Sequence, residues 1–125
     1  MVVTMEQVLA ELDPDEPDYE KAAKLGSEAL PHLEVLVKKE DALLASKATY
    51  LASLIHDKAS IAVLDSAARS VHPEVRVAAA YGSRNLAIPE VKKVLEVLKD
   101  DQDENVRNIS RQLIGAKSHE KEQPE

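Results

Sequence analysis

A repeat with a period of 31 residues constrains the fold of this chain more than any other feature. Tyr19, Tyr50 and Tyr81 follow one another at this spacing and are the only tyrosines in the sequence. The same spacing relates a set of leucines, a Val-Arg pair and a set of expected helix starts: Leu33, Leu64 and Leu95; Val75-Arg76 and Val106-Arg107; Asp41, His72 and Asp103. Self-similarity at such a length is typical of arrays in which each repeat is one supersecondary unit. A stack of similar units is therefore expected.

Each period carries apolar residues at helical spacing twice, which predicts two amphipathic helices per repeat. We expect helices at residues 4–12, 18–25, 28–38, 42–55, 59–69, 73–86, 89–99 and 104–114. Ser27, Asp41 and Asp103 can accept hydrogen bonds from free N–H groups at helix starts. Pro73 and Pro89 suit a first helical position, where no N–H donor is needed.

Two stretches resemble the paired helices of HEAT repeats of the short, phycobilisome-lyase-like kind. They read Gly26-Ser-Glu-Ala-Leu-Pro-His-Leu-Glu-Val-Leu-Val and Pro73-Glu-Val-Arg-Val-Ala-Ala-Ala-Tyr-Gly. The resemblance covers about residues 13–114. It implies an all-α fold, a right-handed α-α superhelix in the form of a HEAT-like helical-hairpin solenoid, with about 3.5 repeats and 7–8 helices.

The expected domain organisation is one solenoid followed by a short tail. The solenoid spans residues 1–115, with a degenerate N-terminal repeat at 1–25, further repeats at 26–56, 57–87 and 88–115, and a disordered tail at 116–125. The first unit departs from the family pattern because it has two prolines and a short second helix. We therefore expect it to act as a cap.

Charge and cysteine content narrow the partner and the compartment. The chain has no cysteine and a formal net charge of −7. It also lacks a basic leader after Met1 and any apolar run near the roughly 20 residues that span a bilayer. We expect a cytoplasmic protein with no membrane partner. The negative charge repels phosphate backbones, which disfavours nucleic acid and leaves a protein of unknown identity as the expected partner.

The sequence predicts no enzyme, no cofactor, and no catalytic, cofactor-binding or metal-binding residues. His32, His56, His72 and His119 are scattered rather than spaced as ligands on one helix face. No Ser-His-Asp set and no phosphate-binding glycine loop can be argued from the sequence. The family resemblance is specific for fold and poor for function, because its members include scaffolds, adaptors, chromophore-lyase subunits and a few enzymes.

The second helix of each repeat is expected to leave one face open, the usual binding surface of a solenoid. At about 100° per residue, the outward arcs contain Val77, Ala80, Tyr81 and Arg84; Ser46, Thr49, Tyr50 and Ser53; and Asn108, Arg111 and Gln112. The tyrosines should then form a row, roughly 10 Å apart at ordinary helix spacing. One hypothesis is that Tyr19, Tyr50 and Tyr81, flanked by Val77, Arg84 and Arg111, bind a peptide or helix of a partner. The alternative is that each ring lies over its neighbouring helix and stabilises the stack.

Two further expectations concern the repeat edges. Similar HEAT repeats pair an arginine with an aspartate near a helix start, so the resemblance implies that Asp103 pairs with Arg107 or Arg76. Ile114 lies on the edge that a following repeat would cover. The tail, a second copy in a homodimer through the C-terminal end, or another partner can cover it. The chain could also be a piece of a longer solenoid.

The favoured function is a non-catalytic protein-binding scaffold or adaptor that uses the concave face of the second helices. One alternative is a bilin-lyase-like accessory subunit, although 125 residues is short for a complete lyase subunit. A less favoured one is a nucleic-acid-binding HEAT-like module, as in HEAT-like alkylpurine glycosylases. Against it, the proposed face offers only Arg84 and Arg111 as strong phosphate contacts.

Overall fold

The computed structural model describes residues 2–87 and 89–122, with residues 117–122 described as backbone only. Throughout these residues the regular structure is helical and no strand occurs. The α-helices are α1 (Met5–Leu12), α2 (Tyr19–Ala22), α3 (Leu30–Val37), α4 (Ala42–Ser53), α5 (Lys58–Ala68), α6 (Pro73–Gly82), α7 (Lys92–Leu98) and α8 (Glu104–Glu122). Short 3-10 helices cover Ala23–Leu25, Ser27–Ala29 and Ser83–Asn85. The chain is thus all-α, as predicted.

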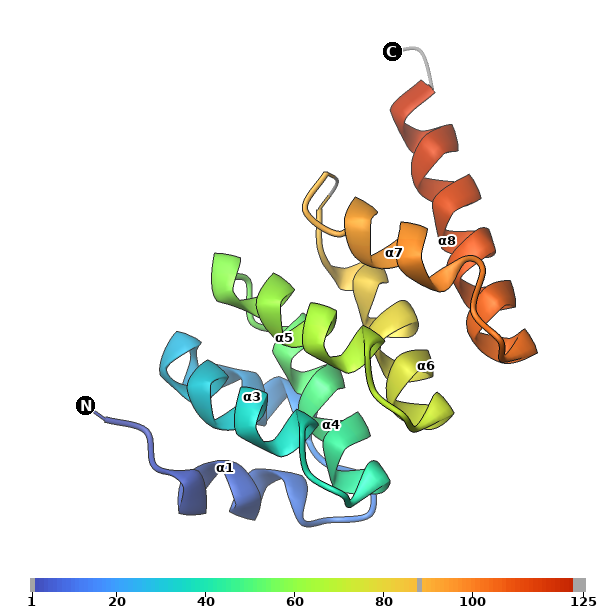
Figure 1. Cartoon of the computed structure of the whole chain (residues 1–125). Helices are drawn as coiled ribbons and strands as arrows, with labels where there is room; N and C mark the ends of the chain where they lie inside the picture. Colours follow the sequence, from blue (N-terminus) through green and yellow to red (C-terminus); the bar gives the residue numbers. More distant parts are fainter. Residues whose placement is uncertain (1, 88, 123–125) are drawn as a thin grey trace.

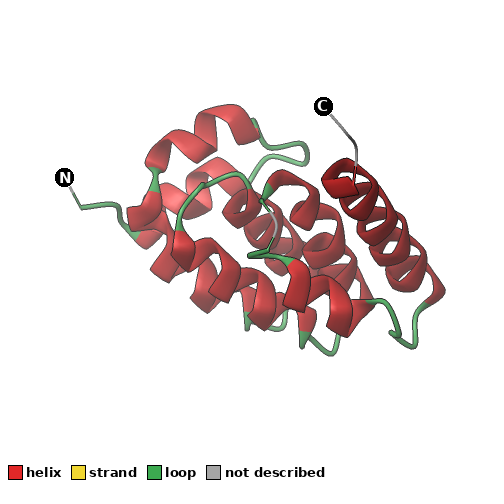
Figure 2. Cartoon of the chain, turned by 90° about the horizontal axis from the view of Figure 1, so that it is seen from above, coloured by secondary structure: helices red, strands yellow, loops and turns green. Residues whose placement is uncertain are grey.

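The helices form two layers (Figures 1 and 2). The first layer holds α3, α5 and α7, and the second holds α4, α6 and α8, which we call the second helices. Each first-layer helix packs against the helix that follows it in the chain, and α3 and α5 also pack against the next helix of their own layer. Helix α1 packs against α3, α4 and the short α2.

Several helix starts are fixed by side chains that accept backbone N–H groups. Asp41 accepts from the Leu44 N–H at 3.0 Å, and Asp103 accepts from the N–H groups of Asn105 and Val106 at 2.8 and 3.1 Å. Pro73 occupies the first turn of α6. These three predicted starts are confirmed. Thr4, Asp18 and Asp57 cap α1, α2 and α5 in the same way.

Two predicted starts are wrong. Ser27 makes no capping bond because it is the first residue of a 3-10 helix, Ser27–Ala29, that follows Gly26 and precedes the start of α3 at Leu30. Pro89 is not the first residue of α7. A turn closed by the bond from the Lys92 N–H to the Pro89 carbonyl, at 3.0 Å, delays the helix to Lys92.

Helices α4 and α6 approach each other closely because small side chains line the seam between them. A Cβ atom added to Gly82 would lie 2.8 Å from the Cβ of Ser53. This approach corrects three positions of the predicted outward arcs, because Thr49, Ser53 and Ala80 are fully buried. The two hydroxyls are satisfied inside α4, where Thr49 donates to the Ala45 carbonyl and Ser53 to the Tyr50 carbonyl.

The chain end also differs from the prediction. The tail was expected to be disordered from residue 116, but α8 continues to Glu122, and residues 123–125 lie outside the described residues. Ala116, Lys117 and Glu120 are strong helix formers, and no proline interrupts the helix before Pro124. Composition alone gave the wrong answer because polar residues can continue a helix that packing has already started.

No helix within residues 2–87 and 89–122 is both long and apolar enough to cross a bilayer.

Candidate binding face on the second helices

The three tyrosines form one continuous row of touching rings, which we call the tyrosine ridge (Tyr19, Tyr50 and Tyr81). The centroids of Tyr19 and Tyr50 are 4.9 Å apart with an interplanar angle of 80°. Those of Tyr50 and Tyr81 are 5.9 Å apart at 28°, a stacked arrangement. The expected spacing of about 10 Å describes helix axes, whereas the side chains lean along the ridge until the rings meet.

Arg84 closes one end of the tyrosine ridge. Its guanidinium carbon lies 3.9 Å above the centroid of the Tyr81 ring, a cation–π contact, and its Nη2 donates to the Tyr50 hydroxyl at 3.3 Å. The hydrogen bond with Tyr50 is the main reason that the pKa of Arg84 lies above its ordinary value. At the other end, burial and then the neighbouring Tyr50 raise the pKa of the Tyr19 hydroxyl above its ordinary value.

Most of the predicted binding residues come together on this ridge, and one does not. Tyr81 is 42% exposed and Tyr19 and Tyr50 are half-buried. Val77, one helical turn before Tyr81, is half-buried and packs partly against the core. Arg111 lies on α8, and its side chain turns instead to the segment before that helix, where it donates to the Lys99 carbonyl at 2.8 Å and lies 3.5 Å from the Asp100 carboxylate.

The second helices carry few charges at the positions equivalent to those around Tyr50 and Tyr81. Nine equivalent positions on the second helices are all exposed or half-buried: Leu43, Ser46 and Tyr50 on α4; Glu74, Val77 and Tyr81 on α6; Asn105, Asn108 and Gln112 on α8. Only Glu74 among them is ionisable at neutral pH, in a chain of which 31% is Asp, Glu, Lys or Arg. Leu43 is 64% exposed. Depletion of charge together with exposed tyrosine and arginine is the composition of a protein–protein contact.

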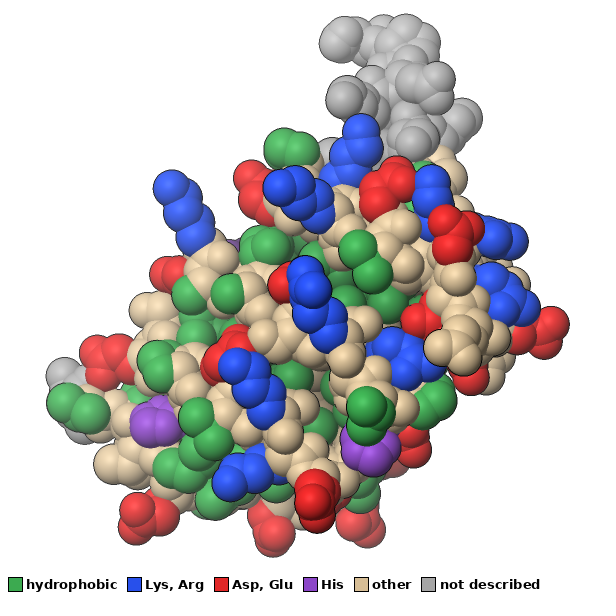
Figure 3. All heavy atoms as spheres, viewed as in Figure 1, with side chains coloured by type: hydrophobic (Ala, Val, Ile, Leu, Met, Phe, Trp, Pro, Cys, Tyr) green, Lys and Arg blue, Asp and Glu red, His purple; other side chains and the backbone are tan. Residues whose placement is uncertain are grey.

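The opposite layer has a different surface. Figure 3 views the side formed by α3, α5 and α7, where acidic and basic side chains are scattered among apolar ones. Part of this charge is paired along the helices, as between Arg69 and Asp65 at 3.2 Å and between Lys38 and Glu34 at 3.2 Å. The nine equivalent positions on the second helices differ in that only Glu74 among them is charged.

The predicted arginine ladder exists with a different acid. Arg76 binds Asp101 through two bonds, of 2.8 and 3.1 Å, and donates to the Ser70 carbonyl at 2.8 Å. Arg107 donates to the carbonyls of Asp101 and Gln102. Asp103 was the wrong partner because its carboxylate caps α8.

The contacts with Arg76 and Arg107 lower the pKa of the Asp101 carboxyl. Burial alone would raise the pKa of Asp101, but the hydrogen bonds from Arg76 and from the Asp103 N–H, with the charges of Arg76 and Arg107, hold it below its ordinary value. The side chains of Asp101 and Arg76 are only 10% and 14% exposed. The contacts of Arg76 and Arg107 with Asp101 therefore hold the turn before α8 against α6.

A buried lysine was missed by the sequence reasoning. Lys47 is 9% exposed, and its Nζ donates to the carbonyls of Leu12 and Pro14 at 3.1 and 2.9 Å. It thereby fixes the end of α1 to α4. The repeat offered a signal, because the equivalent residues are Ala78 and Ile109, and a lysine at a position that is apolar elsewhere calls for buried acceptors.

The histidines form no common site in the described residues. His32 is half-buried, and its Nε2 lies 2.8 Å from the Val3 carbonyl oxygen. His72 precedes α6 without a side-chain capping bond. His119 lies where only the backbone is described. Across the side chains that the structure describes, no group of three His, Cys, Asp or Glu residues is placed to hold a metal ion.

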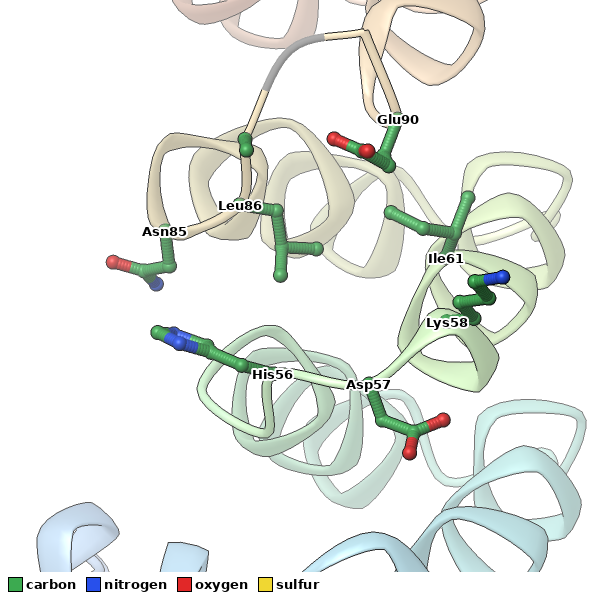
Figure 4. Close-up of a pocket in the computed structure, with 8 residues that line it drawn as sticks. His56, Asp57, Lys58, Ile61, Asn85, Leu86 and Glu90 are labelled. Carbon is green, nitrogen blue, oxygen red and sulfur yellow. The ribbon is translucent and has the colours of Figure 1, made fainter.

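Two surface hollows lie away from the ridge. The one in Figure 4, of about 360 Å³, lies between the α4–α5 turn and the segment after α6; Ile61 and Leu86 point into it and Asp57 points away. Its lining consists of His56, Asp57, Lys58, Ile61, Asn85, Leu86, Ala87 and Glu90. The other, of about 510 Å³, is lined by Val37, Lys38, Lys39, Glu40, Ser66, Arg69, Ser70, Val71 and His72. Sequence reasoning predicted neither hollow.

The C-terminal edge of the stack is open along α8. Ile114 is half-buried, and Val97 on α7 is 57% exposed. Because α8 continues as one helix to Glu122, residues 115–122 do not fold back over Ile114 (Figure 1). The side chains of residues 117–125 lie outside those that the structure describes, so cover of Ile114 by the tail stays a prediction.

The comparison with known proteins found no match for this chain. No family model matches the chain, and neither a curated protein nor a solved structure matches it. What the observations define is a two-layer protein of paired helices with one charge-poor, tyrosine-bearing face.

Proposed function

We propose that this chain is a HEAT-type repeat protein, a right-handed helical-hairpin solenoid that acts as a non-catalytic scaffold or adaptor. The repeat assignment is supported by the way the 31-residue period falls on successive helix pairs: Tyr50 and Tyr81 are one period apart and stack on neighbouring second helices. The hairpins α3–α4, α5–α6 and α7–α8 each take one period.

The observation that carries the function is the surface around the tyrosine ridge. It offers rigid aromatic rings, the half-buried Val77, the exposed Leu43 and one arginine, with Glu74 as the single acid among the equivalent positions. Tyrosine gives a large contact area for little loss of side-chain entropy, and arginine adds directional hydrogen bonds. A protein segment that covered this face would bury apolar area without stranding many charges.

A double variant, Tyr50→Ala with Tyr81→Ala, tests the function once a partner has been captured and identified. Binding of the purified partner is measured by titration calorimetry below the melting temperatures of all variants, with Val71→Ala as the control, because Val71 is 84% exposed and lies outside this face. We expect the double variant to lose at least about tenfold in affinity, as hot-spot tyrosines do. The aromatic contacts should also contribute roughly 0.5–1.5 kcal/mol each to stability.

This experiment distinguishes a role of the tyrosines in partner binding from a role in stabilising the stack of helices. A lower melting temperature with unchanged partner affinity would assign the ridge to cohesion of the stack and reject it as a binding surface. The chain contains no Trp and no Phe, so its near-ultraviolet circular dichroism comes from these three tyrosines alone. A change in that signal when the partner is added gives an independent check that binding occurs at the ridge.

The other predicted functions stay predictions. Retention on heparin at physiological ionic strength tests nucleic-acid binding, and binding of a bilin chromophore tests the lyase-like alternative. Association of two copies through the α8 edge is tested by light scattering of the wild type and of Ile114→Glu. A monomeric wild type would contradict that association.

A further inference from the structure

Arg84 differs from every other arginine of the chain in what it contacts. Each of the others has a carboxylate or a carbonyl partner: Arg69 with Asp65; Arg76 with Asp101; Arg107 with the carbonyls of Asp101 and Gln102; Arg111 with the Lys99 carbonyl and Asp100. In the part of the chain that the structure describes, the hydrogen-bond and cation–π partners of Arg84 are Tyr50 and Tyr81, and no carboxylate pairs with it. Its charge is thus unpaired on the surface of a chain with an excess of acids.

The guanidinium of Arg84 is nevertheless held in place. Tyr81 supports one face of it, at 3.9 Å from the ring centroid, and the Tyr50 hydroxyl accepts one of its N–H donors at 3.3 Å. A guanidinium has five such donors, so several stay free for an incoming acceptor. Because the group is already oriented, binding an anion costs less side-chain entropy than it would at a free arginine.

The surroundings decide which anion fits. The guanidinium fork matches a carboxylate in a bidentate pair. The neighbouring ridge is aromatic, and the net charge of −7 repels polyanions at long range. Glu74, an exposed acid on α6, the helix before Arg84, further disfavours a run of acids. A nucleic acid would also need several cations, whereas Arg111 on α8 is already committed to Lys99 and Asp100.

We propose that the partner docks an apolar segment that carries a single Asp or Glu, whose carboxylate pairs with Arg84 while its apolar neighbours pack on Tyr81 and Tyr50. This inference rests on the proposed function and names the chemistry that the face would recognise. Arg84 would act as the specificity determinant, because a segment with Asn or Gln in place of the acid leaves the guanidinium without its matching charge.

Selection from a random peptide library displayed on phage tests the inference with the full chain as bait. The variants are Arg84→Gln, the ridge variant Tyr50→Ala with Tyr81→Ala, and the control Arg69→Gln, which changes an exposed arginine at the C-terminal cap of α5. We expect selected peptides to carry one Asp or Glu among apolar residues and to lose binding to the ridge variant. Arg84→Gln should weaken them about tenfold, a loss typical of one charge-assisted pair, and Arg69→Gln should leave binding unchanged.

A thermodynamic cycle then assigns the contact. Replacing the acid of a selected peptide by its amide should weaken binding to the wild type about as much as Arg84→Gln does, with no further loss when both changes are combined. The comparison of the acid and amide peptides uses only the unaltered protein, so it holds even if a variant folds poorly. Melting curves of all variants accompany the titrations.

The outcomes distinguish the two proposals. Peptides that need the tyrosines but lack an acid, or that bind Arg84→Gln as well as the wild type, overturn the carboxylate inference and leave the binding face standing. Absence of any ridge-dependent peptide overturns both. A single-stranded oligonucleotide that competes in an Arg84-dependent way would show that the ligand is a phosphate and would also overturn the inference.

Discussion

Replacing Gly82 by alanine should destabilise this protein, although the same change in an ordinary helix is stabilising by about 1 kcal/mol. The added Cβ would lie 2.8 Å from the Cβ of Ser53 and 3.0 Å from its Oγ. Carbon atoms pack best at about 3.5–4.0 Å, so α4 and α6 must separate by roughly 1 Å. Both Cβ atoms are fixed to backbone and cannot rotate away. Overpacking of this kind costs about 3 kcal/mol, which leaves a net loss of about 2 kcal/mol.

Thermal and urea unfolding measure this loss. A drop of about 8 °C in melting temperature is expected, since 1 kcal/mol corresponds to about 4 °C at this chain length. The matched control is Gly115→Ala in α8, where an added Cβ meets nothing within 4 Å, and which should raise stability by up to about 1 kcal/mol. Separation of α4 and α6 should also change the near-ultraviolet signal, because Tyr50 and Tyr81 stack across the same seam.

A double variant isolates the steric cause. Ser53→Gly removes the Cβ that Gly82→Ala would strike, so adding Gly82→Ala to Ser53→Gly should be neutral or stabilising. Equal destabilisation by Gly82→Ala in both backgrounds, or a gain in stability in the wild-type background, would refute the close approach of α4 and α6.

Three further predictions concern single contacts. Asp101→Asn should cost about 3 kcal/mol at neutral pH, because it leaves the buried charge of Arg76 unpaired. Because folding lowers the pKa of Asp101, this carboxylate stabilises the fold above its ordinary pKa, and the stabilisation is lost as the pH falls through the lowered value. Urea unfolding at a series of pH values should show this loss of stability at acid pH in the wild type and a smaller loss in Asp101→Asn. Lys47→Met should leave two carbonyls at the end of α1 without this donor and cost about 2 kcal/mol of unfolding free energy. The readout is amide hydrogen exchange, which the substitution should accelerate more in α1 than in α5. Gly26→Ala should cost about 2 kcal/mol in thermal unfolding, because Gly26 has a φ of 75° and a ψ of −167°, a backbone region that essentially only glycine adopts. An unchanged melting temperature would contradict that backbone conformation.

The sequence determined the local structure of this protein well. Helix existence and type follow from apolar spacing, and the starts at Asp41, Pro73 and Asp103 follow from capping chemistry, because both depend on residues within a turn of each other. The 31-residue period also indicated that Tyr50 and Tyr81 would hold equivalent places. It could do so because the helical repeat of about 3.6 residues fixes which side chains share a face.

The tertiary structure alone decided how the faces meet. Thr49 and Ser53 point away from the core in a helical projection, yet they are buried because Gly82 lets α6 approach α4. The same holds for side-chain partners. Lys47 donates to two carbonyls 33 and 35 residues away in sequence, and Arg76 pairs with Asp101 rather than with Asp103.

Only the packed structure could bring the candidate site to its contact distances. Sequence spacing placed the tyrosines in a row, but the stacking of the rings and the position of Arg84 over Tyr81 depend on the distance between helices. That distance is set by the smallest side chains in the seam, Gly82 and Ser53, which carry no periodic signal of their own. Periodicity encodes direction around a helix, whereas separation between helices arises from the volumes of side chains that meet across them.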